Sequence, residues 1–220
     1  GWDDVLPYFI KAENQERGKN EFHGIGGPLS VSDQRIQLPL LNEFQNAAEE
    51  FGIPKTKDFN TGDNHGCGYF QVTEKDGFRC STAVGYLNPI KKRNNLKIIT
   101  NAHVKKIIFE NKTAKSVEFW QANELKKISA NKEIILSSGS IGSPQILQTS
   151  GIGNTKKLKD LGIEMVHDLK GVGENLQDHL MFRPVYKVKN LKSLNRKINS
   201  LIGNFLIGLE YIFNQSGPMT

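Results

Sequence analysis

Cysteine is scarce in this 220-residue sequence. Cys67 and Cys80 are the only two, they stand thirteen positions apart, and neither belongs to a CxxC pair. Structural zinc sites need closely spaced ligands such as a CxxC pair, and the disulfide frameworks of small secreted proteins need more cysteines. The two cysteines fit neither, and a single bridge between them is the less favoured alternative to a reducing compartment, so we expect a cytoplasmic location.

Long apolar runs are also missing, since no stretch reaches the roughly 20 apolar residues that a spanning helix needs. The most apolar segment runs from Leu194 to Phe213. It is interrupted by charged and amide side chains: Arg196, Lys197, Asn199, Asn204 and Glu210. This pattern predicts a two-faced helix, and packing in a core is favoured over a membrane-surface role. Peripheral membrane association of a full-length protein stays open.

Arginine is sparse among the basic residues. Lysine and arginine total 29 against 23 acidic residues, a net charge of +6, but only six are arginines. The lysines are scattered along the chain and are not gathered with aromatic residues as in nucleic-acid binders. We therefore expect no nucleic-acid partner and interpret the charge as a solvated surface.

Apolar spacing predicts three helices in the first half of the chain. One covers Val5 to Ile10 behind a cap at Asp3 or Asp4. A second follows Pro39, runs through Phe51 and ends at Gly52. A short third begins at Ser81 and ends near Pro89. These elements flank two loops, a glycine-rich one over 18–30 and a long polar one over 55–68, whose length and turn residues favour a functional role.

The second half begins with a predicted β-meander. Its four short strands are expected at 96–99, 104–109, 116–120 and 124–128. A further strand, Glu133 to Leu136, is continuously apolar and should be buried on both faces. It leads into the small residues Ser137 to Ser140, after which Ser143 and Pro144 predict a helix start and Gly151 its end.

The turn at 137–140 has two interpretations. Serine and glycine let a backbone pass close to a flat or charged ligand, and a following helix start suits an anion. A tight turn that needs small residues for packing is the alternative, and spacing alone favours it. A second glycine-rich turn, GVGENLQDH over 171–179, predicts another helix start.

Several segments together resemble one protein family. The sequence GSIGSPQILQTSGIG over 139–153 is similar to the second signature of the glucose-methanol-choline (GMC) oxidoreductases, which depend on FAD. Residues 171–179 resemble the family's GVGxNLxDH segment, and 77–83 with the Tyr-Leu pair at 86–87 resemble its GxRxST segment. Residues 2–31 resemble the choline dehydrogenase branch.

The resemblance implies a fold of the α/β class with mixed α+β elements. It would be part of a doubly wound FAD-binding domain with a β-meander, over 1–183, followed by the start of a substrate-binding domain over 184–220. The implied activity of the full-length protein is oxidation of a primary alcohol, with choline the leading small-molecule substrate, by hydride transfer to FAD. Another alcohol (sugar, aryl or aliphatic) or a non-catalytic interaction module are the alternatives, and the residues identify no electron acceptor.

Two parts of the family pattern are missing here. No GxGxxG fingerprint for the FAD pyrophosphate follows an apolar strand. None of the histidines lies in a motif that matches the family's catalytic pair: His23, His65, His103, His167 and His179. We therefore expect an interior segment with no catalytic residue of its own.

The resemblance does imply cofactor contacts. Val104 matches a strand position whose backbone meets the adenine ring of FAD. Ser138 and Gly139 match a turn that lies beside the adenosine part. Residues 54–80 would correspond to the region that covers the flavin.

Overall fold

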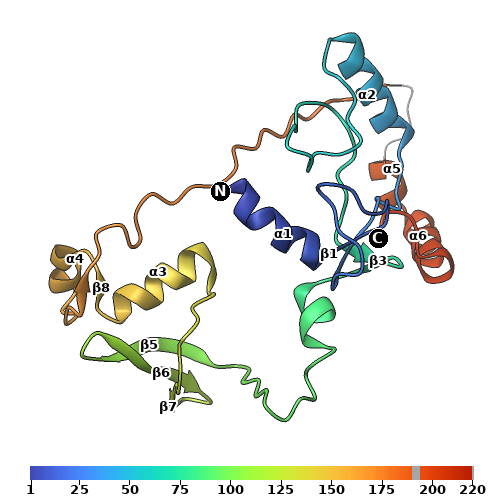
Figure 1. Cartoon of the computed structure of the whole chain (residues 1–220). Helices are drawn as coiled ribbons and strands as arrows, with labels where there is room; N and C mark the ends of the chain where they lie inside the picture. Colours follow the sequence, from blue (N-terminus) through green and yellow to red (C-terminus); the bar gives the residue numbers. More distant parts are fainter. Residues whose placement is uncertain (190–193, 220) are drawn as a thin grey trace. The chain divides into compact units, whose positions relative to one another are not determined.

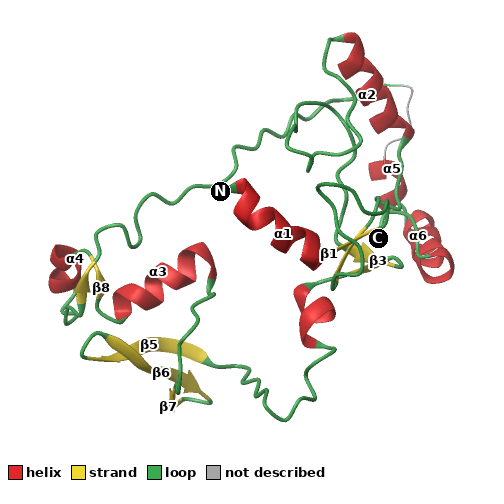
Figure 2. Ribbon diagram, in the orientation of Figure 1, coloured by secondary structure: helices red, strands yellow, loops and turns green. Residues whose placement is uncertain are grey.

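The computed structural model describes residues 1–189 and 194–219. Helices and strands are both present, which confirms the predicted α/β class (Figure 2). The chain forms two compact units, the first from 1–96 with 185–220 and the second from 97–184. The predicted boundary between an FAD-binding domain over 1–183 and a substrate-binding domain over 184–220 stays a prediction.

The first unit combines helices with small two-stranded sheets (Figure 1). Its elements are α1 (Trp2–Ala12), β1 (Glu13–Gln15), β2 (Leu29–Val31), α2 (Pro39–Glu50), β3 (Glu74–Lys75), β4 (Phe78–Arg79), the π-helix η1 (Ala83–Leu87), α5 (Leu194–Ile198) and α6 (Leu201–Asn214). Strands β1 and β2 pair in parallel, and β3 pairs with β4 in antiparallel fashion.

The three helices predicted in the first half of the chain are confirmed as α1, α2 and η1. Helix α2 has Pro39 at its first position, and Gly52 follows its end with a φ of 97°. Helix α1 is capped by Gly1 rather than by Asp3 or Asp4. Both aspartates lie in its first turn, where a negative charge is favoured by the helix dipole. The Asp4 carboxylate accepts a hydrogen bond from the Gly1 amine at 2.6 Å.

The polar stretch over 55–68 is a loop, as predicted. Its ends are joined by a bridge in which Cys67 N donates to the Pro54 oxygen at 2.8 Å and Thr56 N donates to the Cys67 oxygen at 3.0 Å. The loop therefore has a fixed base.

The predicted helix over 194–213 is two helices. Helix α6 starts anew after Ser200, whose hydroxyl accepts a hydrogen bond from Gly203 N at 3.3 Å. Only Gly203 and Ile207 of α6 are buried, whereas Leu201 is 90% and Phe213 78% exposed. The prediction of a packed core helix is wrong for this chain. Apolar residues lie around most of the surface of α6, and the rest of the unit buries only a small part of that surface. No helix in the described ranges is long and apolar enough to cross a bilayer.

The second unit is built around a three-stranded antiparallel sheet. Its elements are β5 (His103–Glu110), β6 (Thr113–Gln121), β7 (Glu124–Ser129), α3 (Gly139–Thr149), β8 (Ile152–Gly153), α4 (Thr155–Asp160) and β9 (His167–Asp168). The strand order is β5-β6-β7, and β8 pairs with β9 in parallel. The buried apolar side chains of this unit are Ile107, Phe119, Ile146 and Leu158.

The meander is confirmed for three of its strands, and two predicted strands are wrong. Neither 96–99 nor 133–136 is a strand in the structure. Ile135, expected to be buried, is 79% exposed. A strand buried on both faces needs neighbouring strands and covering helices, and no described strand pairs with either segment.

Two predicted helix starts also differ from the structure. Helix α3 begins at Gly139, within the small-residue stretch that opens at Ser137, and contains Pro144 within it. The Ser143 hydroxyl accepts a hydrogen bond from Ser138 N at 3.0 Å, so it closes the preceding turn and does not cap a new helix. No helix follows the second glycine-rich turn, since 174–189 has no regular structure.

Asp168 has a shifted pKa for a local reason. The Thr155 hydroxyl and amide both donate to Asp168 Oδ1, at 2.7 and 3.0 Å, and these bonds lower the pKa of the carboxyl. The contribution to stability is present at neutral pH and is lost as the pH falls through that lowered pKa. Replacement Thr155→Ala should raise the pKa in a carboxyl ¹³C NMR titration. Thr149→Ala is the control, and an unchanged pKa in Thr155→Ala would contradict this account.

Candidate functional site

Val104 and Ser138, predicted as cofactor contacts, line one hollow of about 410 Å³ in the second unit. Val104 comes from the start of β5, and Ser138 immediately precedes α3. The other lining residues are Ala102, His103, Lys105, Trp120, Gly142, Gln145, Ile146 and Thr149. The fold thus brings together two residues that are far apart in the sequence.

The walls of this hollow are held together by hydrogen bonds between the end of α3 and the outer edge of β5. The Thr149 hydroxyl donates to the Lys105 oxygen at 3.0 Å, and Ile107 N donates to the Ser150 hydroxyl at 2.8 Å. Ser150 is buried and its hydroxyl also donates to the Ile146 oxygen. Sequence reasoning missed Thr149 and Ser150, since a serine or threonine at a helix end is common and gives no sign of its partner.

Small residues form the turn at the beginning of α3. Gly139 has a φ of 77°, a conformation that favours glycine, although it is not among the residues lining the hollow. A Cβ on Gly142 would lie 3.0 Å from the Cβ of Ser138. Gly142 therefore permits close packing against Ser138. The interpretation of the turn as a ligand contact stays a prediction.

The chemistry of the hollow suits a flat ring. Trp120 contributes an aromatic wall, and the Lys105 amine lies 5.9 Å from its ring centre. Gln145 and Thr149 offer an amide and a hydroxyl. Of the described lining residues, none forms an acid and base pair with another.

The glycine-rich segment 171–179 packs against α3. The Gln148 amide donates to the Val172 oxygen at 3.1 Å, and a Cβ on Gly173 would lie 2.3 Å from the same amide nitrogen. Asp178 and His179 are exposed, and Asp178 accepts a hydrogen bond from the backbone, not the ring, of His179. The segment supports the helix and contains no catalytic pair.

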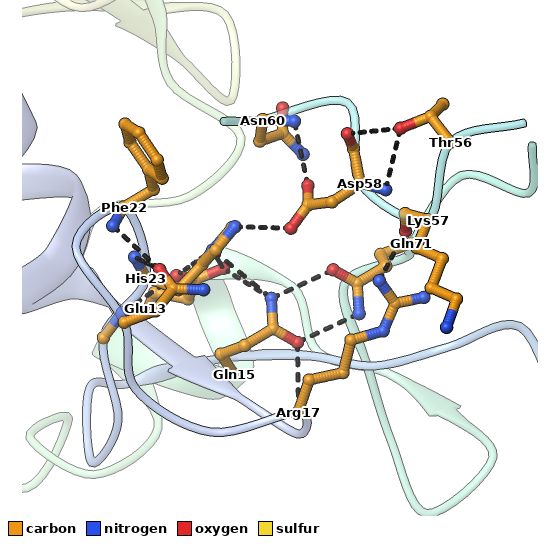
Figure 3. A network of polar contacts seen from close by, with 12 residues as sticks. Glu13, Gln15, Arg17, Phe22, His23, Thr56, Lys57, Asp58, Asn60 and Gln71 are labelled. Atoms are coloured by element: carbon orange, nitrogen blue, oxygen red, sulfur yellow. Dashed lines mark hydrogen bonds and ion pairs between the residues drawn. The ribbon is translucent and has the colours of Figure 1, made fainter. Parts of the chain in front are cut away.

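A second polar arrangement lies in the first unit, and sequence reasoning assigned it no role. His23 is 4% exposed, and its ring contacts Glu13 and Asp58 (Figure 3). Beside it is an apolar hollow of about 340 Å³. Its lining residues are Trp2, Leu6, Phe9, Ala12, Glu13, Phe22, His23, Leu29, Val31, Asn60 and Thr73.

Residues 1–181 match the family model described as GMC oxidoreductase. The chain belongs to the GMC oxidoreductase family. The predicted resemblance is therefore confirmed, and the match ends close to the predicted boundary at 183 without testing it.

Curated relatives that resemble this chain along nearly its whole length include oxygen-dependent choline dehydrogenases. The chain is 42% identical to an oxygen-dependent choline dehydrogenase of Vibrio vulnificus, over 99% of this chain and 39% of that protein. It is 43% identical to one of Pseudomonas fluorescens, over 97% of this chain and 38% of that protein. The chain thus spans about two fifths of these relatives.

Solved structures of oxidoreductases are also similar in fold to this chain. An FAD-dependent oxidoreductase from Chaetomium thermophilum matches with a TM-score of 0.87 and 28% identity, over 99% of this chain and 40% of that one. Pyridoxine 4-oxidase from Mesorbium loti matches with a TM-score of 0.71 and 30% identity, over 76% of this chain and 33% of that one.

Proposed function

We propose that the full-length protein oxidises a primary alcohol with FAD as cofactor, and that choline is the substrate. The single observation that carries the choice of substrate is the identity of 42% to an oxygen-dependent choline dehydrogenase along nearly the whole chain. The FAD-dependent relative from Chaetomium thermophilum supports the choice of cofactor.

The hollow beside β5 is the part of this chain that would hold FAD. The backbone of Val104 would meet the adenine ring, and the turn of Ser138 and Gly139 would lie beside the adenosine. The residues fit this role because the lining is side-chain-poor at the turn and aromatic at Trp120. When bound, FAD supplies the acceptor for a hydride.

The residues of this chain would bind and orient the cofactor without moving the hydroxyl proton. His103 is the one histidine that lines the hollow, and it is exposed with no carboxylate partner among the described residues. A general base must lie within hydrogen-bond reach of the proton that it takes. We therefore place the base outside these 220 residues.

Purified full-length protein should show a flavin spectrum and turn over choline with an artificial electron acceptor. We expect kcat/KM for choline to exceed that for sugar and aryl alcohols by about 10²-fold, the scale on which a matched pocket discriminates. The 220-residue chain with added FAD is the negative control. Preference for another alcohol would overturn the substrate, and turnover proportional to the concentration of the short chain would overturn the location of the base.

The second candidate is the same flavin chemistry on a different alcohol. It is favoured by the structural match to pyridoxine 4-oxidase at 30% identity. The substrate panel separates the two. A full-length protein that carries no flavin would instead support the non-catalytic module.

A further inference from the structure

His23 joins two segments of the first unit that are far apart in the sequence. Its Nδ1 lies 2.8 Å from Glu13 Oε2 on β1, and its Nε2 lies 2.9 Å from Asp58 Oδ2 in the loop over 55–68 (Figure 3). The ring is buried, so water cannot replace either partner freely.

Both ring nitrogens face groups that only accept hydrogen bonds. A neutral imidazole carries one N–H and an imidazolium carries two, whereas an ionised carboxylate carries none. The Gln15 amide nitrogen is also near, 3.4 Å from Nδ1. Its two N–H groups have closer acceptors, Glu13 Oε1 at 3.1 Å and Gln71 Oε1 at 3.0 Å. In this geometry both ring nitrogens can donate at once only when the ring is doubly protonated.

The two carboxylates depend on this ring to different degrees. Glu13 also accepts hydrogen bonds from Gly24 N, at 3.1 Å, and from the Gln15 amide. Asp58 Oδ1 accepts from Asn60 N at 2.9 Å, within the loop itself. Among the described residues, His23 is the donor from outside the loop that reaches the Asp58 carboxylate. The loop is thus connected to β1 at Asp58 by the hydrogen bond that a proton on His23 Nε2 donates.

The remaining proton of a neutral ring belongs on Nδ1. That nitrogen contacts both Glu13 oxygens, at 3.0 and 2.8 Å, whereas Nε2 faces one oxygen of Asp58. Loss of one proton would leave the Nε2 lone pair facing a carboxylate oxygen, which is repulsive.

The neighbouring charges do not replace this contact. Arg17 pairs with Asp33 at 2.6 Å and donates to the Lys57 backbone oxygen. Its guanidinium therefore holds the loop one residue before Asp58 but neutralises neither carboxylate of the cluster. The residues of α1 that share the adjacent hollow are uncharged: Trp2, Leu6, Phe9 and Ala12.

We propose that a proton on His23 locks the loop at Asp58 to strand β1, and that loss of this proton releases the loop at this residue. Because His23 and Asn60 both line the apolar hollow of about 340 Å³, release of the loop displaces part of the wall of that hollow. The lock involves the first unit alone and is independent of the proposed FAD chemistry.

The test follows amide hydrogen exchange in the loop between about pH 5 and about pH 9, the range in which histidine changes charge. Rates are converted to protection factors, which removes the intrinsic effect of pH. Protection at Asp58 and Asn60 should fall about tenfold or more as the pH rises, the scale of one lost charge-assisted hydrogen bond. Protection at Gln15 N, which donates to the Gly24 oxygen at 2.8 Å, reports that the unit stays folded.

Variants of Asp58 separate the lock from general packing. Asp58→Asn should keep the loop protected at every pH, because its amide can accept from the charged ring or donate to the neutral one. Asp58→Ala should leave the loop unprotected throughout. His65→Gln, a change at an exposed histidine of the same loop, should behave as wild type.

Ring ¹⁵N shifts give an independent measurement. Where the loop is protected, His23 should show protons on both nitrogens. A singly protonated ring in the protected state would overturn the proposal, and so would a fall in loop protection with pH that persists unchanged in Asp58→Asn.

Discussion

Full-length protein carrying Ser138→Phe should lose most of its FAD, with a Kd raised about 10²-fold, or roughly 3 kcal/mol. Ser138 lines the hollow beside β5, and a phenyl ring there would occupy the space proposed for the adenosine part of the cofactor. The Ser138 side chain makes no capping hydrogen bond to α3, so its replacement removes no helix contact. The loss of FAD should therefore come without a loss of folding.

The matched control is Ser129→Phe, the same chemical change at an exposed position of β7. The flavin content of purified protein and a titration of the apoprotein with FAD provide the measurement. Stoichiometric flavin in Ser138→Phe would refute the placement of the cofactor. A folded Ser138→Phe variant without flavin, beside a yellow Ser129→Phe variant, would support it.

Gly24→Ala should destabilise the first unit by about 3 kcal/mol, near the upper end for overpacking. An added Cβ would lie 1.8 Å from the Ile10 backbone oxygen. The residue is tied on both sides, since its oxygen accepts from Gln15 N at 2.8 Å and its amide donates to Glu13 at 3.1 Å. The backbone cannot move away without breaking these bonds.

Gly208→Ala is the control for this substitution in the same unit. Gly208 lies in α6, and an added Cβ there would meet nothing within 4 Å. Alanine should therefore stabilise the helix by about 0.5 to 1 kcal/mol, because it restricts the unfolded chain. Urea unfolding monitored for each variant gives both values. A urea midpoint of Gly24→Ala equal to that of the wild type would show that the structure accommodates the added Cβ without loss of stability.

The sequence predicts well those elements that depend only on the spacing of apolar residues and of turn residues nearby in the chain. Helix α2 needs only its apolar face, Pro39 and Gly52. The strands of the meander alternate over short distances and pair with their neighbours in the chain. The segment over 133–136 has an equally clear apolar pattern, yet it is not a strand, because strand pairing depends on partners that spacing does not specify.

The candidate sites divide in the same way. Val104 and Ser138 each lie in a motif that resembles the family, and the structure places both at one hollow. Their contact with a cofactor stays a prediction. Ser150 could not be predicted, since its role depends on the strand edge that it contacts. The His23 lock requires residues from β1, the turn at Gly24 and the loop at Asp58 to meet, and no periodicity in the sequence indicates such a meeting.

The contacts of Thr149 and Ser150 with β5 have a consequence for the solubility of the meander. An open strand edge can recruit a strand from another molecule and begin aggregation. In the described sheet, the outer edge of β5 is engaged at Lys105 and Ile107 by these two hydroxyls. The opposite edge is β7, which carries Lys126 and Lys127, and edge lysines discourage such addition. One edge is therefore protected by hydrogen bonding and the other by charge.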